Sequence, residues 1–227
     1  MNHSVFVVTI DGPAGVGKGT LAKQLASHFN FFYLDSGAVY RAVALRVLQK
    51  NINPEDRTGI INAAKDIKLE FPAQSNYQAY EQGINVDAAL RSEECSEMAS
   101  KIASFPGVRA EVLDLQKSFR KAPGLVGDGR DLGTVVFPDA QAKIFLDASC
   151  DERAQRRYKQ LINQGIGASF DHLFDSIRAR DERDRTRSTS PLVAAEGAWV
   201  IDSTELTIEE VFSIAAEYTQ RQLSMST

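Results

Sequence analysis

Hydrophobic and polar positions follow two patterns that alternate along the chain. Short apolar runs rich in β-branched residues, typical of strands buried in a parallel sheet, predict strands at 5–10, 31–34, 125–127, 143–147 and 199–202. Longer segments with apolar residues at helical spacing predict a helix starting near Lys18 and others at 38–50, 108–121, 151–163, 170–183 and 208–222. Strands that alternate with helices indicate an α/β fold with a parallel sheet and right-handed crossovers.

One segment interrupts this alternation. Between residues 66 and 87, runs of alternating polarity separated by Asn76 and Gly83 predict a small antiparallel sheet, with strands at 67–71, 77–80 and 84–87. A short acidic helix is predicted at 92–104. We therefore expect residues 37–104 to form an insertion in the α/β core.

The composition narrows the class of protein. A chain of 227 residues with 43% hydrophobic and 25% charged residues is typical of one globular domain. The net charge of −4 and the pI near 5.5 argue against a general nucleic-acid binder. Two distant cysteines and three scattered histidines (His3, His28, His172) indicate a reducing compartment and argue against a disulfide framework or a zinc site. Without a secretion signal or a long apolar run, we expect a cytoplasmic protein with no membrane span.

The strongest chemical signal is the glycine-rich segment after the first strand. Gly12, Gly17 and Lys18 match the phosphate-loop pattern G-x-x-x-x-G-K-[ST], but Gly19 stands where Ser or Thr is expected and Thr20 comes one place later. Glycines let the backbone approach a ligand, and the amides and the helix N-terminus attract an anion. Lys18 would add its charge to the β- and γ-phosphates of ATP. The predicted ATP-binding loop consists of Gly12, Pro13, Ala14, Gly15, Val16, Gly17, Lys18, Gly19 and Thr20.

Polar side chains that follow the second predicted strand suggest a second ligand. Asp35 or Ser36 is suited to cap the helix that begins near residue 38. Arg41 lies one turn later and points back toward the helix start, where its guanidinium can hold a phosphate. Arg109 opens a helix after a Pro-Gly turn, and a cation placed against the helix dipole favours a role in ligand binding.

A further charged group follows the strand that we expect to end at Gly127. Asp128, Arg130 and Asp131 would lie beyond the carboxyl end of a parallel strand, where open α/β sheets bind ligands. Asp128 can support Mg²⁺ through water, and Arg130 can clamp a phosphoryl group. A self-paired charged loop is the simpler alternative.

Residues 177–187 hold five arginines and three acidic residues on a predicted helix. At about 100° per residue, Arg180, Arg183, Asp184 and Arg187 share one face. Such runs are usually solvated helices with ion pairs one turn apart. Beside a phosphate loop, the same face can hold phosphates and a ribose and can stabilise a phosphoryl group in transfer.

Taken together, these segments resemble the bacterial-type cytidylate kinase family of nucleoside monophosphate kinases. The matching pieces, in family order, are 10–20, 34–41, 105–109, 127–140, 143–149 and 180–187. The resemblance implies a P-loop core with a five-stranded parallel sheet (1–36, 105–150 and 192–227), an inserted nucleoside-monophosphate-binding part (37–104) and a helical lid (151–191). It implies transfer of a phosphoryl group from ATP to CMP or dCMP, for which we expect a direct in-line reaction. Nothing in the sequence demands more than a monomer, and the acidic pI and the lack of a long apolar run predict no nucleic-acid or membrane partner.

The resemblance also implies which side chains contact CMP. The phosphate would be held by Arg41 and Arg130, and Ser36 belongs to the same substrate-binding set. The cytosine would be contacted by Ser100, Arg109 and Asp131, with Arg187 nearby. The sugar would be held by Arg180 and Asp184. An aspartate at 131 can accept from the amine of cytosine but would face a carbonyl of uracil, which disfavours UMP.

The roles implied for ATP and its metal ion are fewer. The catalytic set would be Lys18, Arg130, Arg180 and Arg187. Arg157 and the loop after Asp202 are candidates for contacts with adenine. No direct metal ligand is expected, and Mg²⁺ would arrive with ATP and reach Thr20 or Asp128 through water.

Three other functions stay open at this stage. Another P-loop phosphotransferase, acting on UMP, dTMP or a small alcohol such as shikimate, would share the loop, although Ser100 and Asp131 suit an amine-bearing pyrimidine. A nucleotide-dependent switch without turnover is disfavoured because the chain has no Asn-Lys-x-Asp guanine signature. RNA binding through the arginine helix is disfavoured by the acidic pI.

Overall fold

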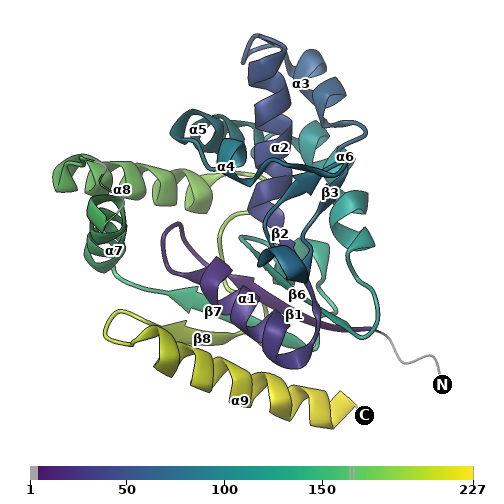
Figure 1. Cartoon of the computed structure of the whole chain (residues 1–227), viewed down its shortest axis with the longest axis vertical. Coiled ribbons are helices and arrows are strands. Elements are labelled where there is room, and N and C mark those ends of the chain that lie inside the picture. Colours follow the sequence, from purple (N-terminus) through teal and green to yellow (C-terminus); the bar gives the residue numbers. More distant parts are fainter. Residues whose placement is uncertain (1–4, 164, 166, 227) are drawn as a thin grey trace.

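A parallel five-stranded sheet forms the centre of the molecule. The computed structural model describes residues 5–163, 165 and 167–226, so residues 1–4, 164, 166 and 227 of the predicted core and lid, His3 included, lie outside the described residues. The strands are β1 (Phe6–Asp11), β2 (Phe32–Asp35), β6 (Gly124–Gly129), β7 (Ala142–Asp147) and β8 (Trp199–Asp202), in the order β2-β6-β1-β7-β8 (Figure 1). All four pairings are parallel, which confirms the predicted fold class.

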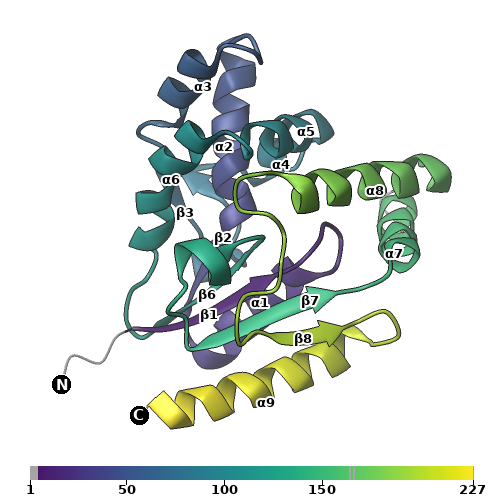
Figure 2. The same cartoon turned by 180° about the vertical axis from the view of Figure 1, so that it is seen from behind.

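Helices cover both faces of this sheet. On one side, α1 (Lys18–Phe29) and α9 (Ile208–Ser226) contact each other (Figure 1). On the other side lie α2 (Ser36–Gln49) and α6 (Pro106–Ser118), seen from behind in Figure 2. Because β1 is sandwiched between these layers, every one of its residues is buried, which explains its continuous apolar run. No helix among the described residues is both long and apolar enough to cross a bilayer.

The start of α2 differs from the prediction by two residues. The helix begins at Ser36 because the Asp35 carboxylate accepts a hydrogen bond from the Ala38 amide at 2.8 Å and caps it. Of the two predicted caps, Asp35 is the one that forms. The cap places Ser36 and Arg41 at the carboxyl end of β2, beside the end of β6.

The end of β6 was predicted wrongly. The strand continues to Gly129, so Asp128 lies on the strand, in register with Ile10 and Asp35, and not in the following loop. The glycines that suggested a strand end are packing sites, because a Cβ on Gly127 or Gly129 would lie 2.8 Å from the Leu132 side chain. An unpredicted π-helical turn, Leu132–Val136, then folds this segment back against β1.

The predicted insertion contains more helix than expected. Its elements are α3 (Arg57–Ala64), β3 (Leu69–Glu70), a 3₁₀ turn (Ala73–Ser75), β4 (Tyr80–Glu81), β5 (Ile84–Asn85), α4 (Asp87–Leu90) and α5 (Glu93–Ile102). The antiparallel sheet β3-β4-β5 is confirmed, but α3 was not predicted. The strand expected from residue 77 starts only at Tyr80, because Asn76 and Tyr77 both adopt left-handed φ angles and turn the chain.

Two further helices project from the sheet side by side. These are α7 (Cys150–Asn163) and α8 (Phe170–Thr186), which contact each other and lie opposite α4 and α5 in Figure 1. The helix α8 continues three residues past its predicted end at residue 183. Its arginine-rich half thereby reaches the carboxyl ends of the central strands.

Candidate active site

The phosphate loop (residues 12–20) connects β1 to α1 with a backbone that only glycine can follow. Gly12 has a φ of +153°, and a Cβ there would lie 2.0 Å from the Leu146 carbonyl oxygen. Lys18 is 6% exposed, and its Nζ donates to the Pro13 carbonyl oxygen at 2.7 Å. Burial lowers the pKa of Lys18 well below its ordinary value, and the Arg130 guanidinium lowers it further. The negative charge of a bound phosphate would act against both effects and raise the pKa of Lys18.

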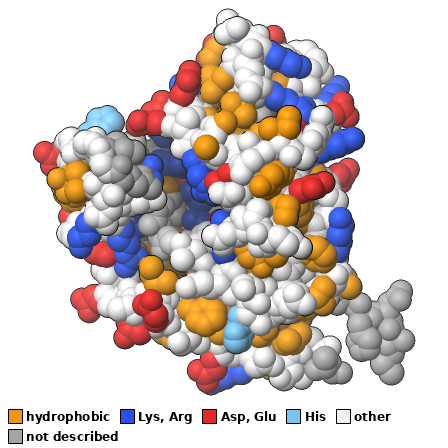
Figure 3. All heavy atoms as spheres, viewed as in Figure 1, with side chains coloured by type: hydrophobic (Ala, Val, Ile, Leu, Met, Phe, Trp, Pro, Cys, Tyr) orange, Lys and Arg blue, Asp and Glu red, His pale blue; other side chains and the backbone are white. Residues whose placement is uncertain are grey.

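A cavity of about 620 Å³ opens in front of this loop. Figure 3 shows it as a hollow with Lys and Arg side chains at its base, between α7 and α8 on one side and the rest of the molecule on the other. Most of the predicted site residues line it: Ala14, Gly15, Gly17, Lys18, Gly19, Thr20, Ser36, Arg41, Ser100, Arg109, Asp128, Arg130, Asp131, Arg180, Asp184 and Arg187. The sequence motifs, distant along the chain, therefore converge on one site.

Four predicted residues do not line this cavity. Gly12, Pro13 and Val16 are buried behind the surface of the phosphate loop. Arg157 is exposed on α7 and donates to Gln160 Oε1 at 3.0 Å. The contact of Arg157 with adenine therefore stays a prediction.

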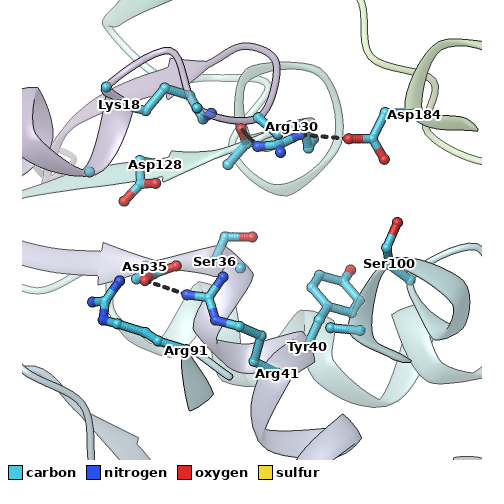
Figure 4. Close-up of a pocket in the computed structure, with 18 of the residues that line it drawn as sticks. Lys18, Asp35, Ser36, Tyr40, Arg41, Arg91, Ser100, Asp128, Arg130 and Asp184 are labelled. Carbon is cyan, nitrogen blue, oxygen red and sulfur yellow. Dashed lines mark hydrogen bonds and ion pairs between the residues drawn. The ribbon is translucent and has the colours of Figure 1, made fainter. Parts of the chain in front are cut away.

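Ion pairs orient the arginines of the cavity. Arg41 donates to Asp35 at 2.7 Å, Arg130 donates to Asp184 at 2.8 Å (Figure 4), and Arg109 pairs with Asp131. Burial alone would raise the pKa of Asp184, but Arg130 and Arg180 hold it below its ordinary value. The Arg130–Asp184 pair also joins the end of β6 to α8, across 54 residues of sequence.

Other polar atoms at the cavity have no hydrogen-bond partner among the described residues. They are Ser100 Oγ, Arg41 Nε, Arg180 Nε and Arg187 Nη2. Leaving a buried donor unpaired costs free energy, so a ligand in this cavity that accepts hydrogen bonds from these side chains would be stabilised. Burial lowers the pKa of Arg180 to about 10, with Arg130 as the next cause, so an anion bound here would gain from two crowded cations.

The Asp128 carboxylate lies against the first turn of α1. It accepts a hydrogen bond from the Tyr33 hydroxyl at 2.8 Å, and a Cβ placed on Gly19 would lie 4.0 Å from both of its oxygens. Burial of the carboxyl group, followed by repulsion from Asp35, raises the pKa of Asp128 to about 6. The described residues form no cluster of three or more metal-ligating side chains. A single carboxylate fits a Mg²⁺ ion that keeps its waters and is held mainly by phosphates.

Among the residues at or beside the cavity that sequence reasoning missed, three make specific contacts with site residues or their neighbours. Tyr40 lines the cavity, with the Arg109 guanidinium 5.7 Å from its ring centroid. Gln116 is 1% exposed and donates to Ser36 Oγ at 2.8 Å. Arg91 also lines the cavity and pairs with Asp87 through two bonds of 2.7 and 3.0 Å.

Two of these omissions had a signal in the sequence. Gln116 continues the spacing of Val108 and Val112 on the apolar face of its helix, where a polar side chain needs a partner. Tyr40 lies one turn after Ser36, on the same face of α2. Nothing in the sequence indicated that Arg91 would reach the cavity.

A second cavity of about 460 Å³ is lined by residues at the start of α7, along α8 and in the loop after β8. The predicted loop after Asp202 contributes Thr204 to it. Arg153 separates this space from the phosphate loop, because its guanidinium donates to the Ala14 carbonyl oxygen at 2.9 Å and forms two bonds with Asp181. The second cavity therefore lies behind Arg153 as seen from the phosphate loop.

The family model and the curated relatives that match this chain agree on one family. The family model described as "Cytidylate kinase" matches residues 8–221. A curated cytidylate kinase from Aeromonas salmonicida is 48% identical, over 96% of this chain and 95% of its own length. One from Pasteurella multocida is also 48% identical, over 97% of both chains. A crystal structure of an uncharacterized protein from Eubacterium ventriosum covers 95% of this chain and 98% of its own, with a TM-score of 0.51 and 12% identity, a likeness of fold alone.

Proposed function

The chain belongs to the cytidylate kinase family of nucleoside monophosphate kinases, and on that premise we propose that it transfers the γ-phosphoryl group of ATP directly to the phosphate of CMP or dCMP. The observation that carries the proposal is the shared cavity. Lys18 of the phosphate loop lines the same space as Ser100, Arg180 and Arg187, each of which has a buried polar atom without a hydrogen-bond partner among the described residues. A site of this kind suits two phosphate-bearing substrates.

The transfer itself needs little covalent chemistry from the protein. The acceptor phosphate is already an anion, so no general base has to activate it, and no intermediate on the enzyme is required. Lys18 and Arg130 neutralise charge on the transferring group, and Arg41 fixes the acceptor phosphate. Arg180 approaches from α8. Positioning and charge neutralisation then supply most of the rate acceleration.

Cytosine is selected by groups on the insertion and at the end of β6. Asp131, paired with Arg109, accepts a hydrogen bond from the exocyclic amine, and Ser100 Oγ donates to the ring acceptors. Uracil would bring a carbonyl oxygen against the Asp131 carboxylate, which disfavours UMP. Arg180 and Asp184 hold the sugar.

The ATP base and its metal ion are assigned to the flanks of the phosphate loop. Adenine is assigned to the second cavity, near Thr204. Arg157 of α7 does not line this cavity and would have to change its conformation to contact the base. Thr20 and Asp128 would hold Mg²⁺ through its waters. When bound with ATP, the ion neutralises phosphate charge during transfer.

The predicted division into parts follows from the same proposal. Residues 151–191 act as a lid that brings Arg180 and Arg187 onto the phosphates and excludes water, while residues 37–104 carry the CMP side. The proposal also includes that the enzyme acts in the cytoplasm and as a monomer.

ADP release with Mg-ATP and a panel of CMP, dCMP, UMP, dTMP, AMP and shikimate tests the function. We expect turnover with CMP and dCMP, and much slower turnover with UMP. Equal rates with UMP would contradict the role of Asp131. No turnover with any acceptor, despite ATP binding, would exclude the kinase function.

A further inference from the structure

Asp11, the last residue of β1, has a polar role that the proposed reaction does not use. It directly precedes Gly12, the first residue of the phosphate loop, and is 3% exposed. Its Oδ1 accepts the Leu132 amide hydrogen at 2.9 Å, and its Oδ2 accepts the Gly133 amide hydrogen at 2.8 Å. One carboxylate therefore holds two consecutive amides from a segment more than a hundred residues away.

The two amides belong to the turn that follows the CMP-binding side chains. Arg130 and Asp131 immediately precede Leu132, and no side chain caps the π-helical turn from within. The fit around the carboxylate is close, because a Cβ on Gly133 would lie 3.3 Å from Asp11 Oδ2. A shift of the turn away from β1 would carry Asp131 and Arg130 with it.

This contact requires a charged group in an unfavourable place. Burial raises the pKa of Asp11 to about 6, even though both amides stabilise its charge, and the nearby Asp131 carboxylate repels it. Only an ionised carboxylate can accept both amide hydrogens with its two oxygens. An asparagine of the same shape would accept one and turn an N–H₂ donor toward the other.

We propose that Asp11 is a positioning residue that fixes the CMP-binding segment, residues 130–133, to the start of the phosphate loop. It touches neither substrate and acts through the two amides of Leu132 and Gly133. The effect on CMP rests on the proposed function, whereas the effect on the amides does not. The same residue sets the distance between the two halves of the site, one for each nucleotide.

Asp11→Asn tests the proposal, with Thr9→Val as the matched control. Thr9 is buried on the same strand, and its Oγ1 has no hydrogen-bond partner among the described residues. We expect the KM for CMP to rise at least about tenfold in Asp11→Asn, since a hydrogen bond to a charged group is lost. The preference for CMP over UMP should fall, while the KM for ATP changes less than about threefold. Thr9→Val should resemble the wild type in all three.

Hydrogen exchange provides a readout that does not depend on catalysis. The Leu132 and Gly133 amides should exchange faster in Asp11→Asn than in the wild type or in Thr9→Val. Asp11→Glu keeps the charge but moves it by one methylene, so its amide exchange rates should lie between those of the wild type and Asp11→Asn. It is the variant to measure if Asp11→Asn does not fold. Unchanged exchange, or equal losses for CMP and ATP, would overturn the proposal. If the wild type fails to phosphorylate CMP while the exchange rates differ as expected, only the proposed function fails.

Discussion

The buried carboxylate of Asp128 lowers the stability of the fold, although it is suited to a role in catalysis. Burial raises its folded-state pKa to about 6, above the ordinary value of 3.8. The folded chain therefore binds a proton more readily than the unfolded chain, and the charge lowers stability at pH values above about 6. This cost disappears as the pH falls toward 4.

Asp128→Asn should therefore raise the melting temperature at pH 8 while it weakens catalysis. The variant keeps a side-chain oxygen for the Tyr33 hydroxyl but removes the buried charge. The gain in melting temperature over the wild type should shrink as the pH is lowered from 8 to 5. Turnover should fall about 10–100-fold if the carboxylate orients the waters of Mg²⁺. Thermal unfolding across pH and steady-state kinetics measure both effects.

Asp139→Asn is the control for this prediction. Asp139 is exposed, and its hydrogen bond from Arg120 holds its pKa below the ordinary value. Its replacement should slightly lower the melting temperature at pH 8 and leave turnover unchanged. A melting temperature of Asp128→Asn below that of the wild type at pH 8 would refute the argument from burial.

Lys18 gives a second prediction at this scale. Lys18→Met keeps the length of the side chain and removes a charge that burial already disfavours, so the fold should persist. Turnover should drop at least about 100-fold, because the charge on the transferring phosphates loses its partner. ADP release and circular dichroism measure the two properties. Lys143→Met, outside both cavities, should behave as the wild type. Activity of Lys18→Met near the wild-type level would refute the role of the lysine.

The phosphate loop was predictable at the level of single residues because its chemistry is local. Gly12 and Gly17 lie in the loop between β1 and α1, and Lys18 is the first residue of α1. The contact of Gln116 with Ser36 spans 80 residues, so only the fold reveals that partner. A motif whose residues act within one short segment can be predicted from sequence, whereas the partner of a side chain that contacts a distant segment cannot.

At the scale of elements, a buried ion pair fixes α8 to α7, in addition to the Arg130–Asp184 pair that joins α8 to the end of β6. Arg153 on α7 is 2% exposed and pairs with Asp181 on α8, at 3.2 and 2.5 Å. It also donates to Ala148 and Ala14 carbonyl oxygens at 3.0 and 2.9 Å. Asp181 directly follows Arg180 in sequence, so this pair sets where Arg180 enters the cavity.

Asp181→Asn should lower the free energy of unfolding by about 3 kcal/mol, because it leaves the Arg153 charge buried without its partner. Urea unfolding measures the change. Asp175→Asn is the control on the same helix, since its pair with Arg178 is exposed and should contribute less than about 1 kcal/mol. Equal effects of the two substitutions would show that the Arg153–Asp181 pair does not anchor α8.

The type of an element could be predicted where its hydrophobic residues follow a clear pattern. The run at β1 and the helical spacing at α9 gave the right type of element, because both bury an apolar face. β6 was predicted too short because glycine has no side chain to display the pattern, and the Leu132 side chain fills the space instead. The two-residue strands of the insertion are likewise too short for a period to mark their ends.

The whole molecule carries a net charge of −4, yet its main cavity has the opposite sign. Its lining includes eight cationic residues, Lys18, Lys23, Arg41, Arg91, Arg109, Arg130, Arg180 and Arg187. It also includes five acidic residues, Asp35, Asp87, Asp128, Asp131 and Asp184. The composition gives the sign of the net charge, but the excess of positive charge at the cavity becomes visible only when the fold brings distant segments together. The field that a nucleotide meets near the site is therefore attractive, although the net charge alone would repel it.

The rate constant kcat/KM for CMP should consequently fall as NaCl is raised from 20 to 300 mM, by about three- to tenfold, because salt screens the attraction at the cavity. Steady-state kinetics over this range measure the slope. Arg221→Gln removes an exposed charge from α9, outside both cavities, and should leave the slope nearly unchanged. If kcat/KM instead rose with salt, repulsion by the net negative charge would dominate the encounter. The arginines of the cavity would then act only after CMP has bound.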